Sequence, residues 1–169
     1  MQEEWFPLVD EEGRVLGRVT RRQAHGDPSL LHPVVHCLIL DAAGRLLLQL
    51  RSRNKDIQPG RWDTSVGGHV SEGETPEQAV LREIREELGV AADPGQLRFL
   101  YRYLMRSEVE SELVTTYLWR SEGPFVAQPE EIDALRFWSF EEIRAALGGG
   151  ALTPNFEDEF RRFLQVDRG

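Results

Sequence analysis

The segment from Thr75 to Gly89 carries the start and stop signals of one α-helix, and the two faces of that helix differ. Thr75 can cap the first turn, Pro76 suits the next position, and Gln78 completes a capping box with Thr75. Gly89 ends the helix directly after its last apolar residue. One face is apolar and carries Val80, Leu81, Ile84 and Leu88. A chain built around this helix must supply a sheet or another helix to bury that face.

Short apolar runs bounded by turn residues predict strands on both sides of this helix. The predicted strands cover residues 6–10, 14–20, 34–40, 46–51, 97–105 and 113–120, and a short strand is expected at Phe137-Trp138. Two later helices are predicted, one capped by Ser139 with Glu142 as its partner, and one opening at Thr153-Pro154. Strands and helices do not alternate regularly, which favours an α+β fold or a mixed-sheet α/β sandwich.

The 169 residues are about what one domain needs, so we expect a single domain over residues 1–169. Its expected parts are a strand pair and loop at 1–33, a core at 34–147 and a C-terminal helix at 151–166. Residues 21–33 are polar and contain two prolines, so they are predicted to form a loop. Residues 52–74 are rich in glycine and proline and are predicted to form a long functional connection.

Composition and charge exclude several kinds of partner. The chain is 40% hydrophobic and carries a net charge of −9, so no duplex nucleic acid is expected, because such proteins usually present a basic face. No segment approaches the roughly 20 apolar residues of a membrane helix, and the start does not resemble a signal peptide. The one cysteine, Cys37, lies in an apolar run, so we expect a buried thiol, a reducing compartment and a cytoplasmic protein.

Three glutamates, Glu83, Glu86 and Glu87, fall within a 100° arc of the predicted helix. One interpretation is a solvated acidic face, partly offset by an Arg82–Glu86 pair. The other is a site for hard divalent cations, because Mg²⁺ takes oxygen ligands and tolerates clustered carboxylates. Glu74, just before the helix cap, can approach the same region. Spacing alone leaves both interpretations open.

The segment around this helix resembles the complete signature of the Nudix hydrolases. The matching positions are Gly68, Glu74, Arg82-Glu83-Ile84, Glu86-Glu87 and Gly89-Val90. The resemblance implies a Nudix-like fold, a mixed α/β/α sandwich with a mixed β-sheet between helices. It also implies hydrolysis of a diphosphate linkage in a nucleoside diphosphate derivative or a related small organic diphosphate.

The same resemblance assigns roles within the signature. Glu83, Glu86 and Glu87, together with the Gly68 carbonyl, are implied ligands of Mg²⁺ or Mn²⁺. Arg82 and Glu74 are implied to orient those ligands. The proton acceptor comes from the helix or from a loop before a late strand, where Glu130 and Glu131 are the candidates. These two are equally compatible with ordinary solvated loop charges.

Histidines and two further glutamates form a second candidate set. His25 and His32 lie in the 21–33 segment, His69 follows Gly68, and Glu110 and Glu112 are two residues apart. On a strand, that spacing points both carboxylates to one face. Such a nitrogen and oxygen set suits Mn²⁺, Fe²⁺ or Zn²⁺ more than Mg²⁺. Spacing alone does not assemble these five residues into a site.

From about Val9 to Glu112 the chain also resembles isopentenyl-diphosphate isomerase, an enzyme on the Nudix fold. That resemblance implies one metal, Mn²⁺ or Zn²⁺, held by His25, His32, His69, Glu110 and Glu112. It also implies that three basic residues hold the substrate diphosphate, namely Arg21, Arg51 and Lys55. Whether this second site binds metal is left as an open hypothesis.

Two departures separate the chain from the isomerase. The isomerase has a reactive cysteine two residues before the site histidine, where this chain has Gly67. It also has an arginine where Glu83 stands. We therefore expect an isomerase-like Nudix hydrolase acting on a small-molecule diphosphate. The alternatives are isomerase-type proton transfer and a non-catalytic ligand-sensing module. The family often forms homodimers, so a homodimer is an open expectation.

Overall fold

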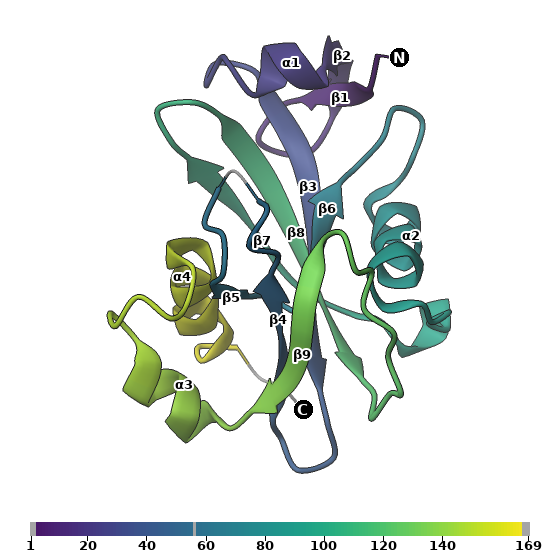
Figure 1. The fold of residues 1–169 in the computed structure, drawn as a ribbon. Coiled ribbons are helices and arrows are strands. Elements are labelled where there is room, and N and C mark those ends of the chain that lie inside the picture. Colours follow the sequence, from purple (N-terminus) through teal and green to yellow (C-terminus); the bar gives the residue numbers. More distant parts are fainter. Residues whose placement is uncertain (1–2, 56, 167–169) are drawn as a thin grey trace.

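The computed structural model describes residues 3–55 and 57–166 (Figure 1). The strands are β1 (Trp5–Val9), β2 (Val15–Thr20), β3 (Leu31–Leu40), β4 (Leu46–Arg51), β5 (Trp62–Asp63), β6 (Val66–His69), β7 (Arg98–Arg106), β8 (Ser111–Arg120) and β9 (Ile132–Trp138). The helices are α1 (Arg21–Ala24), α2 (Pro76–Leu88), α3 (Phe140–Ala146) and α4 (Pro154–Phe163), with a 3₁₀ turn at Pro94–Gln96.

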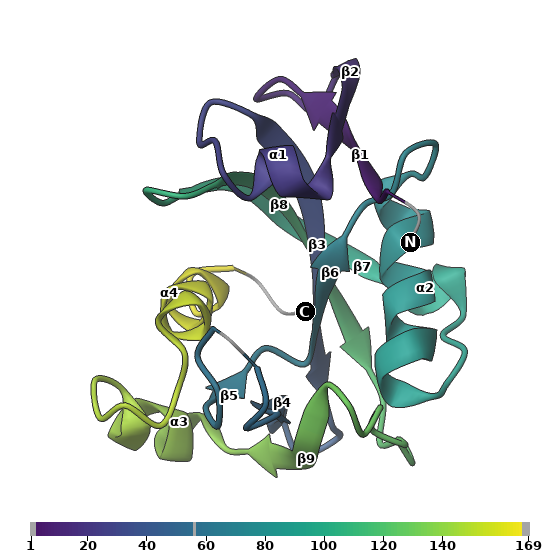
Figure 2. The same cartoon turned by 45° about the horizontal axis from the view of Figure 1, so that its top comes forward.

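A mixed sheet forms the middle of the molecule. Its strand order is β5-β4-β3-β8-β7, with β6 paired to β3 and β9 paired to β4. The β3–β8 pair is parallel, and the other pairs in this sheet are antiparallel. β1 and β2 form a separate two-stranded sheet that lies with α1 at one end of β3 (Figures 1 and 2).

Helices cover both faces of the sheet, as the alternation of side chains along β3 requires. Val35, Cys37 and Ile39 pack in the cluster that includes the apolar face of α2. Leu38 and Leu40 pack in the cluster that includes the phenylalanines of α4. Figure 1 shows α2 on one side of the sheet and α3 and α4 on the other. The predicted mixed α/β/α sandwich is therefore confirmed.

The start and end signals of α2 are as predicted. Thr75 and Gln78 form the capping box, and Gly89 ends the helix in the left-handed conformation, with φ of 67°. The core face differs in one detail: Ala79 is fully buried, whereas Leu81 is only half-buried. Cys37 is free and fully buried, as expected. None of the described helices is long and apolar enough to cross a membrane.

Two predicted loops contain regular structure. Residues Arg21–Ala24 are helical because Thr20 and Gln23 form a second capping box, and β3 begins at Leu31 although Pro33 lies within it. Pro33 has no N–H to donate. The strand tolerates it because the pairing of β3 with β6 begins only at the next residue, Val34, while Pro33 itself stays paired in register with Leu113 of β8. The 52–74 connection contains β5 and β6. β9 begins at Ile132, earlier than the predicted strand at Phe137-Trp138.

Candidate active site

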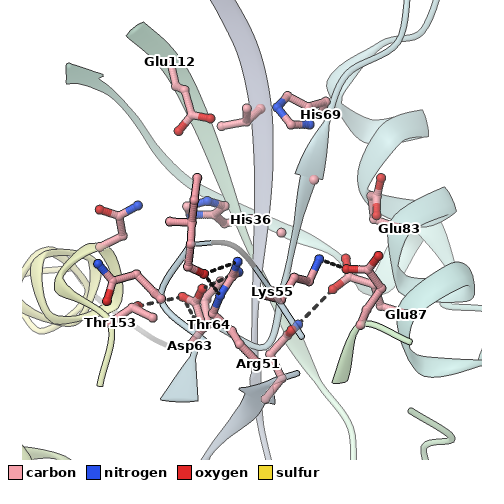
Figure 3. Close-up of a pocket in the computed structure, with 18 of the residues that line it drawn as sticks. His36, Arg51, Lys55, Asp63, Thr64, His69, Glu83, Glu87, Glu112 and Thr153 are labelled. Carbon is pink, nitrogen blue, oxygen red and sulfur yellow. Dashed lines mark hydrogen bonds and ion pairs between the residues drawn. The ribbon is translucent and has the colours of Figure 1, made fainter. Parts of the chain in front are cut away.

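One pocket of about 740 Å³ gathers nearly all the predicted site residues. It lies between α2, the β3–β6 pair and α4, and the loop that carries Lys55 crosses it (Figure 3). Glu83, Glu86 and Glu87 line the α2 side, and we call these three residues with Gly68 the carboxylate site. In Figure 3, Glu83 and Glu87 project from α2 into the pocket.

Glu87 is the most buried carboxylate of this site. Its Oε1 accepts a hydrogen bond of 2.9 Å from Gln49 Nε2, whereas its Oε2 is buried and has no hydrogen-bond partner. Burial raises the pKa of Glu87 well above its ordinary value, and the charge of Glu83 raises it further against the opposing effect of Gln49. Burial also raises the pKa of Glu83. A buried carboxyl oxygen without a donor is stabilised by a proton or by a bound cation.

Arg82 connects the carboxylate site to the loop before α2. Its guanidinium donates to both oxygens of Glu74, at 2.7 and 2.9 Å, and to the carbonyl of His69 at 2.9 Å. Nη1 donates to Glu83 at 2.7 Å and to Glu86 at 3.2 Å. The fork geometry of arginine allows one side chain to hold three carboxylates in fixed directions. The geometry supports the predicted orienting role of Arg82 and Glu74.

Gly68 lies against Glu83, and this contact requires a glycine. A Cβ at position 68 would overlap the carboxyl group of Glu83. The absence of a side chain therefore lets the Glu83 carboxylate reach the backbone of β6. Together with the unpartnered Oε2 of Glu87, this arrangement fits the binding of a divalent cation by carboxylate and carbonyl oxygens.

The five residues of the second candidate set meet where α1, β3, β6 and the start of β8 converge, and we call them the imidazole cluster. His25 Nε2 lies 3.2 Å from His69 Nε2 and 3.4 Å from Glu110 Oε2. His32 Nε2 lies 3.8 Å from Glu110 Oε2 and 3.9 Å from Glu112 Oε2. Among the described residues, two triples bring their ligand atoms within 4.8 Å of one another: His25–His32–His69 and His32–Glu110–Glu112.

Two imidazoles of this cluster, His32 and His69, are held as neutral ligands. Burial, together with nearby cations, lowers the pKa of His69 to about 3. Burial also lowers the pKa of His32, whose Nδ1 lies 3.4 Å from the Leu30 carbonyl. Its Nε2 is buried without a hydrogen-bond partner. A neutral ring nitrogen with a free lone pair, next to two carboxylates, fits a transition-metal ion.

Cationic side chains also line the pocket. Arg51 is held by hydrogen bonds to the Ile57 carbonyl, at 2.9 and 3.1 Å, and by a 3.4 Å ion pair with Asp63. Lys55 forms an ion pair with Glu131, and Arg21 pairs with Glu4 at 2.8 Å. Arg21, Arg51 and Lys55 all line the pocket.

The two loop glutamates differ in position. Glu131 lines the pocket and faces Lys55. Glu130 is exposed, lies 3.5 Å from Gln128 Nε2 and is not part of the pocket lining. The geometry therefore favours Glu131 over Glu130 as a group that can reach a substrate.

Several pocket residues were not predicted from the sequence. Gln49 holds Glu87, and Asp63 holds both Arg51 and the Thr153 hydroxyl. His36 Nδ1 lies 2.6 Å from Oε1 of Glu159, an α4 residue that is only 1% exposed. The available signal was the helical spacing of Glu159, three residues after Phe156 and four before Phe163, which places an acid on the apolar face of the last helix.

A mixed sheet between helices, with this glutamate motif on the helix that follows β6, defines the Nudix class. The family model of the NUDIX domain matches residues 30–159, and the chain belongs to this family. The predicted enzyme class, a Nudix-type hydrolase, is thereby confirmed.

Particular relatives agree with this assignment. The chain is 36% identical over 148 residues to an uncharacterized Nudix hydrolase of Yersinia pestis, covering 84% of this chain and 76% of the relative. It is also 36% identical over 152 residues to an isopentenyl-diphosphate Delta-isomerase of Nocardia farcinica, covering 87% of each. The crystal structure of DR0079 from Deinococcus radiodurans superposes with a TM-score of 0.81 at 30% identity, covering 94% of this chain and 98% of that one.

Proposed function

We propose that the protein hydrolyses a diphosphate linkage in a small organic diphosphate, with Mg²⁺ or Mn²⁺ held by Glu83, Glu86, Glu87 and the Gly68 carbonyl. One observation carries the proposal. The buried, unpartnered Oε2 of Glu87 lines the same pocket as the cations Arg51 and Lys55. Divalent ions bound at the carboxylates would neutralise diphosphate oxygens and orient a water molecule.

Side chains of the protein bind the substrate, orient the metal ligands and accept the proton. Arg51 and Lys55 bind phosphate oxygens by charge-assisted hydrogen bonds, and Arg82 fixes the directions of the acidic ligands. Glu131 is the proton acceptor we favour, because it lines the pocket and its partner Lys55 can be drawn away by substrate. On this proposal E131Q lowers kcat roughly 100-fold, whereas E130Q changes it less than twofold. Equal effects of the two variants would remove Glu131 from this role.

Hydrolysis is favoured over isomerisation for a reason of chemistry. Isomerisation needs a group that protonates carbon, and Gly67 provides none where the isomerase has its cysteine. The test is a panel of nucleotide and prenyl diphosphates with Mg²⁺ and Mn²⁺ in parallel, measuring release of phosphate or nucleoside monophosphate. Proton exchange of isopentenyl diphosphate in deuterated water would instead support isomerisation. Tight binding without turnover would support a sensing module.

We further propose that the imidazole cluster binds a second ion, Mn²⁺ or Zn²⁺. The preassembled ligand atoms and the unpartnered Nε2 of His32 support this assignment. The double variant E86Q/E87Q disables the carboxylate site only. It should retain about one equivalent of Mn²⁺ or Zn²⁺ by elemental analysis, and a metal-free double variant would refute the second site. We place the enzyme in the cytoplasm, because its one cysteine is a free thiol, and leave a homodimer as a prediction.

A further inference from the structure

The α4 side of the pocket, opposite the carboxylate site, is lined by polar groups that neither ligand set uses. We call it the α4 subsite; its residues are His36, Asp63, Thr64, Thr153, Asn155 and Glu159. Phe156 also borders the pocket but is only 1% exposed, so it offers little apolar surface. In Figure 3, His36 lies in the middle of the pocket, with Asp63 and Thr153 on the side toward α4.

Glu159 is the anchor of this subsite. It lies on the apolar face of α4, where its neighbours Phe156, Phe160 and Phe163 are fully buried or nearly so. A carboxylate in that position costs free energy that a leucine would not, unless donors surround it. Donors do surround it: Tyr101 donates its hydroxyl to Oε2, and Thr116 Oγ1 lies 3.3 Å from Oε1.

These donors fix the state of the imidazole. With Tyr101 and Thr116 donating to it, Glu159 accepts, so the His36 nitrogen 2.6 Å from its Oε1 must carry a proton. The remaining nitrogen, Nε2, is left for the pocket. Burial alone would lower the pKa of His36, but the hydrogen bond and charge of Glu159 raise it overall, and the charges of Glu112 and Asp63 act in the same direction. Nε2 is therefore the ring nitrogen that can form a hydrogen bond with a ligand in the pocket.

Gly67 keeps this imidazole accessible. A Cβ at position 67 would lie 3.2 Å from His36 Cδ2 and 3.7 Å from Nε2, tighter than an ordinary contact at the first of these atoms. A larger side chain there would press against the ring.

Two further observations connect the subsite to a ligand. Asp63 Oδ2 pairs with Arg51 at 3.4 Å, and its Oδ1 accepts from the Thr153 hydroxyl at 3.0 Å, which joins the diphosphate side to the start of α4. Thr64 is 6% exposed, and its Oγ1 has no hydrogen-bond partner. An unpartnered hydroxyl on this wall indicates that a group outside the protein completes its bonding.

We infer that the α4 subsite binds the organic half of the substrate through hydrogen bonds, and that His36 Nε2, oriented by Glu159, forms one of these hydrogen bonds. The ligand class is a diphosphate joined to a polar ring, such as a nucleoside or a sugar. A prenyl diphosphate is disfavoured, because its hydrocarbon would leave these polar groups without partners. This inference rests on the proposed function. His36 is a binding residue, and Glu159 is a positioning residue that acts through it.

The test measures binding with non-hydrolysable probes in the presence of Mg²⁺, by titration calorimetry. The probes are the α,β-methylene analogues of the four common nucleoside diphosphates and of isopentenyl diphosphate, with methylenediphosphonate as the probe that lacks an organic half. H36L should weaken the best nucleoside probe roughly 10- to 100-fold, the range for leaving a buried polar group without its hydrogen-bond partner. It should change methylenediphosphonate binding less than twofold.

Two conservative variants separate recognition from mere support of the fold. The amide of H36Q can place a donor near the position of Nε2, so this variant should recover most of the affinity that H36L loses. E159Q keeps the size of the side chain but removes the charge that orients the imidazole, and should weaken the nucleoside probe about tenfold with the same selectivity. Thermal unfolding of each variant serves as the folding control.

The outcomes distinguish this inference from the proposed function. The inference is overturned if the isopentenyl probe binds more tightly than every nucleoside probe, or if H36L weakens methylenediphosphonate as much as the nucleoside probe. It is also overturned if methylenediphosphonate binds as well as every nucleoside probe. In each case a diphosphate site remains. If no probe binds, methylenediphosphonate included, then the proposed function itself fails.

Discussion

The carboxylate site and the imidazole cluster are both sets of metal-type ligands, but the chain assembles them in opposite ways. The carboxylate site comes from one helix and the strand end before it, and Arg82 Nη1 bridges two of its acids, Glu83 and Glu86. The imidazole cluster draws on α1, β3, β6 and the start of β8, and its ligand atoms already lie within 4.8 Å of one another in two triples.

The two sites also differ in the protons that their ligands must lose when an ion binds. In the imidazole cluster, burial lowers the pKa of His32 and His69, so these two ligands are neutral and need lose no proton, whereas Glu112, with its pKa raised to about 7, must lose one. In the carboxylate site, burial raises the pKa of Glu83 and Glu87, and an ion must displace protons before the carboxylates can coordinate it. The carboxylate site therefore suits catalytic ions that bind and leave. The imidazole cluster suits a structural or resident ion.

The largest expected effect is loss of hydrolysis when the carboxylate site is broken. E87Q removes the charge from the most buried ligand, and we expect kcat to fall roughly 10³-fold, as for loss of a main electrostatic stabiliser of the transition state. E77Q, an exposed position in the first turn of the same helix, is the matched control and should retain full activity. Steady-state kinetics at saturating Mg²⁺ provide the measurement, and wild-type kcat in E87Q would rule out Glu87 as a ligand.

The next effect concerns stability and belongs to the imidazole cluster. Burial and the charge of Glu110 raise the pKa of Glu112 to about 7, against the opposing effect of His36. The folded state therefore holds a proton that the unfolded chain releases near pH 4.5. The stabilisation is complete below that pH and is lost as the pH rises to about 7. The change amounts to on the order of 3 kcal/mol.

Urea unfolding of metal-free protein at pH 5 and at pH 7.5 tests this sign. The variant E112Q should lose less stability across this interval than the wild type, whereas E108Q, an exposed control, should follow the wild type. Addition of Mn²⁺ should restore stability at pH 7.5, because an ion takes the place of the proton. An identical pH slope in E112Q and wild type would show that Glu112 ionises normally.

A smaller effect is expected from the residue that orients the carboxylates. R82K keeps the positive charge but cannot hold Glu74, Glu83 and Glu86 at once, so kcat should fall about 10- to 100-fold, the cost typical of a lost orienting partner. R85K, an exposed position on the same helix, is the control. If Arg82 serves only the stability of the loop before α2, R82K will lower the melting temperature and leave kcat unchanged.

The same contrast explains how much of the site was predictable from sequence. The carboxylate site is local: a helix period of 3.6 residues places Glu83, Glu86 and Glu87 together, and the capping signals at Thr75 and Gly89 set the helix ends. The imidazole cluster depends on strand register. His32 lies opposite Glu112 only because β3 and β8 run parallel in that register. His69, in β6, lies opposite Val34 of β3. Spacing along the chain contains neither fact, so only the family resemblance assembled that set.

The α4 subsite was missed for a related reason. Its central pair joins residues 123 positions apart, and the signal of Glu159 is one acid among phenylalanines, which spacing rules read as an ordinary helix residue. The loop predicted at 21–33 failed differently. Thr20 and Gln23 form a capping box that starts a one-turn helix, and the prolines at 28 and 33 come after this helix and do not prevent it.

The smallest expected effect separates the two regions through the N-terminal hairpin, which reaches only one of them. The ring of Phe6 stacks on His69 with centroids 4.5 Å apart and planes 6° from parallel, and it also stacks on His32. F6L keeps an apolar side chain but loses both stacks, so it should cost about 1 kcal/mol of stability and weaken Mn²⁺ binding by the imidazole cluster up to about tenfold.

V19A, in the same small hydrophobic cluster, provides a control with a comparable packing loss and no ring contact. Mn²⁺ titration should distinguish the two variants, while their kcat values stay equal. If F6L lowers kcat as much as it weakens the Mn²⁺ affinity of the cluster, then the two regions act as one catalytic centre rather than as two separate sites.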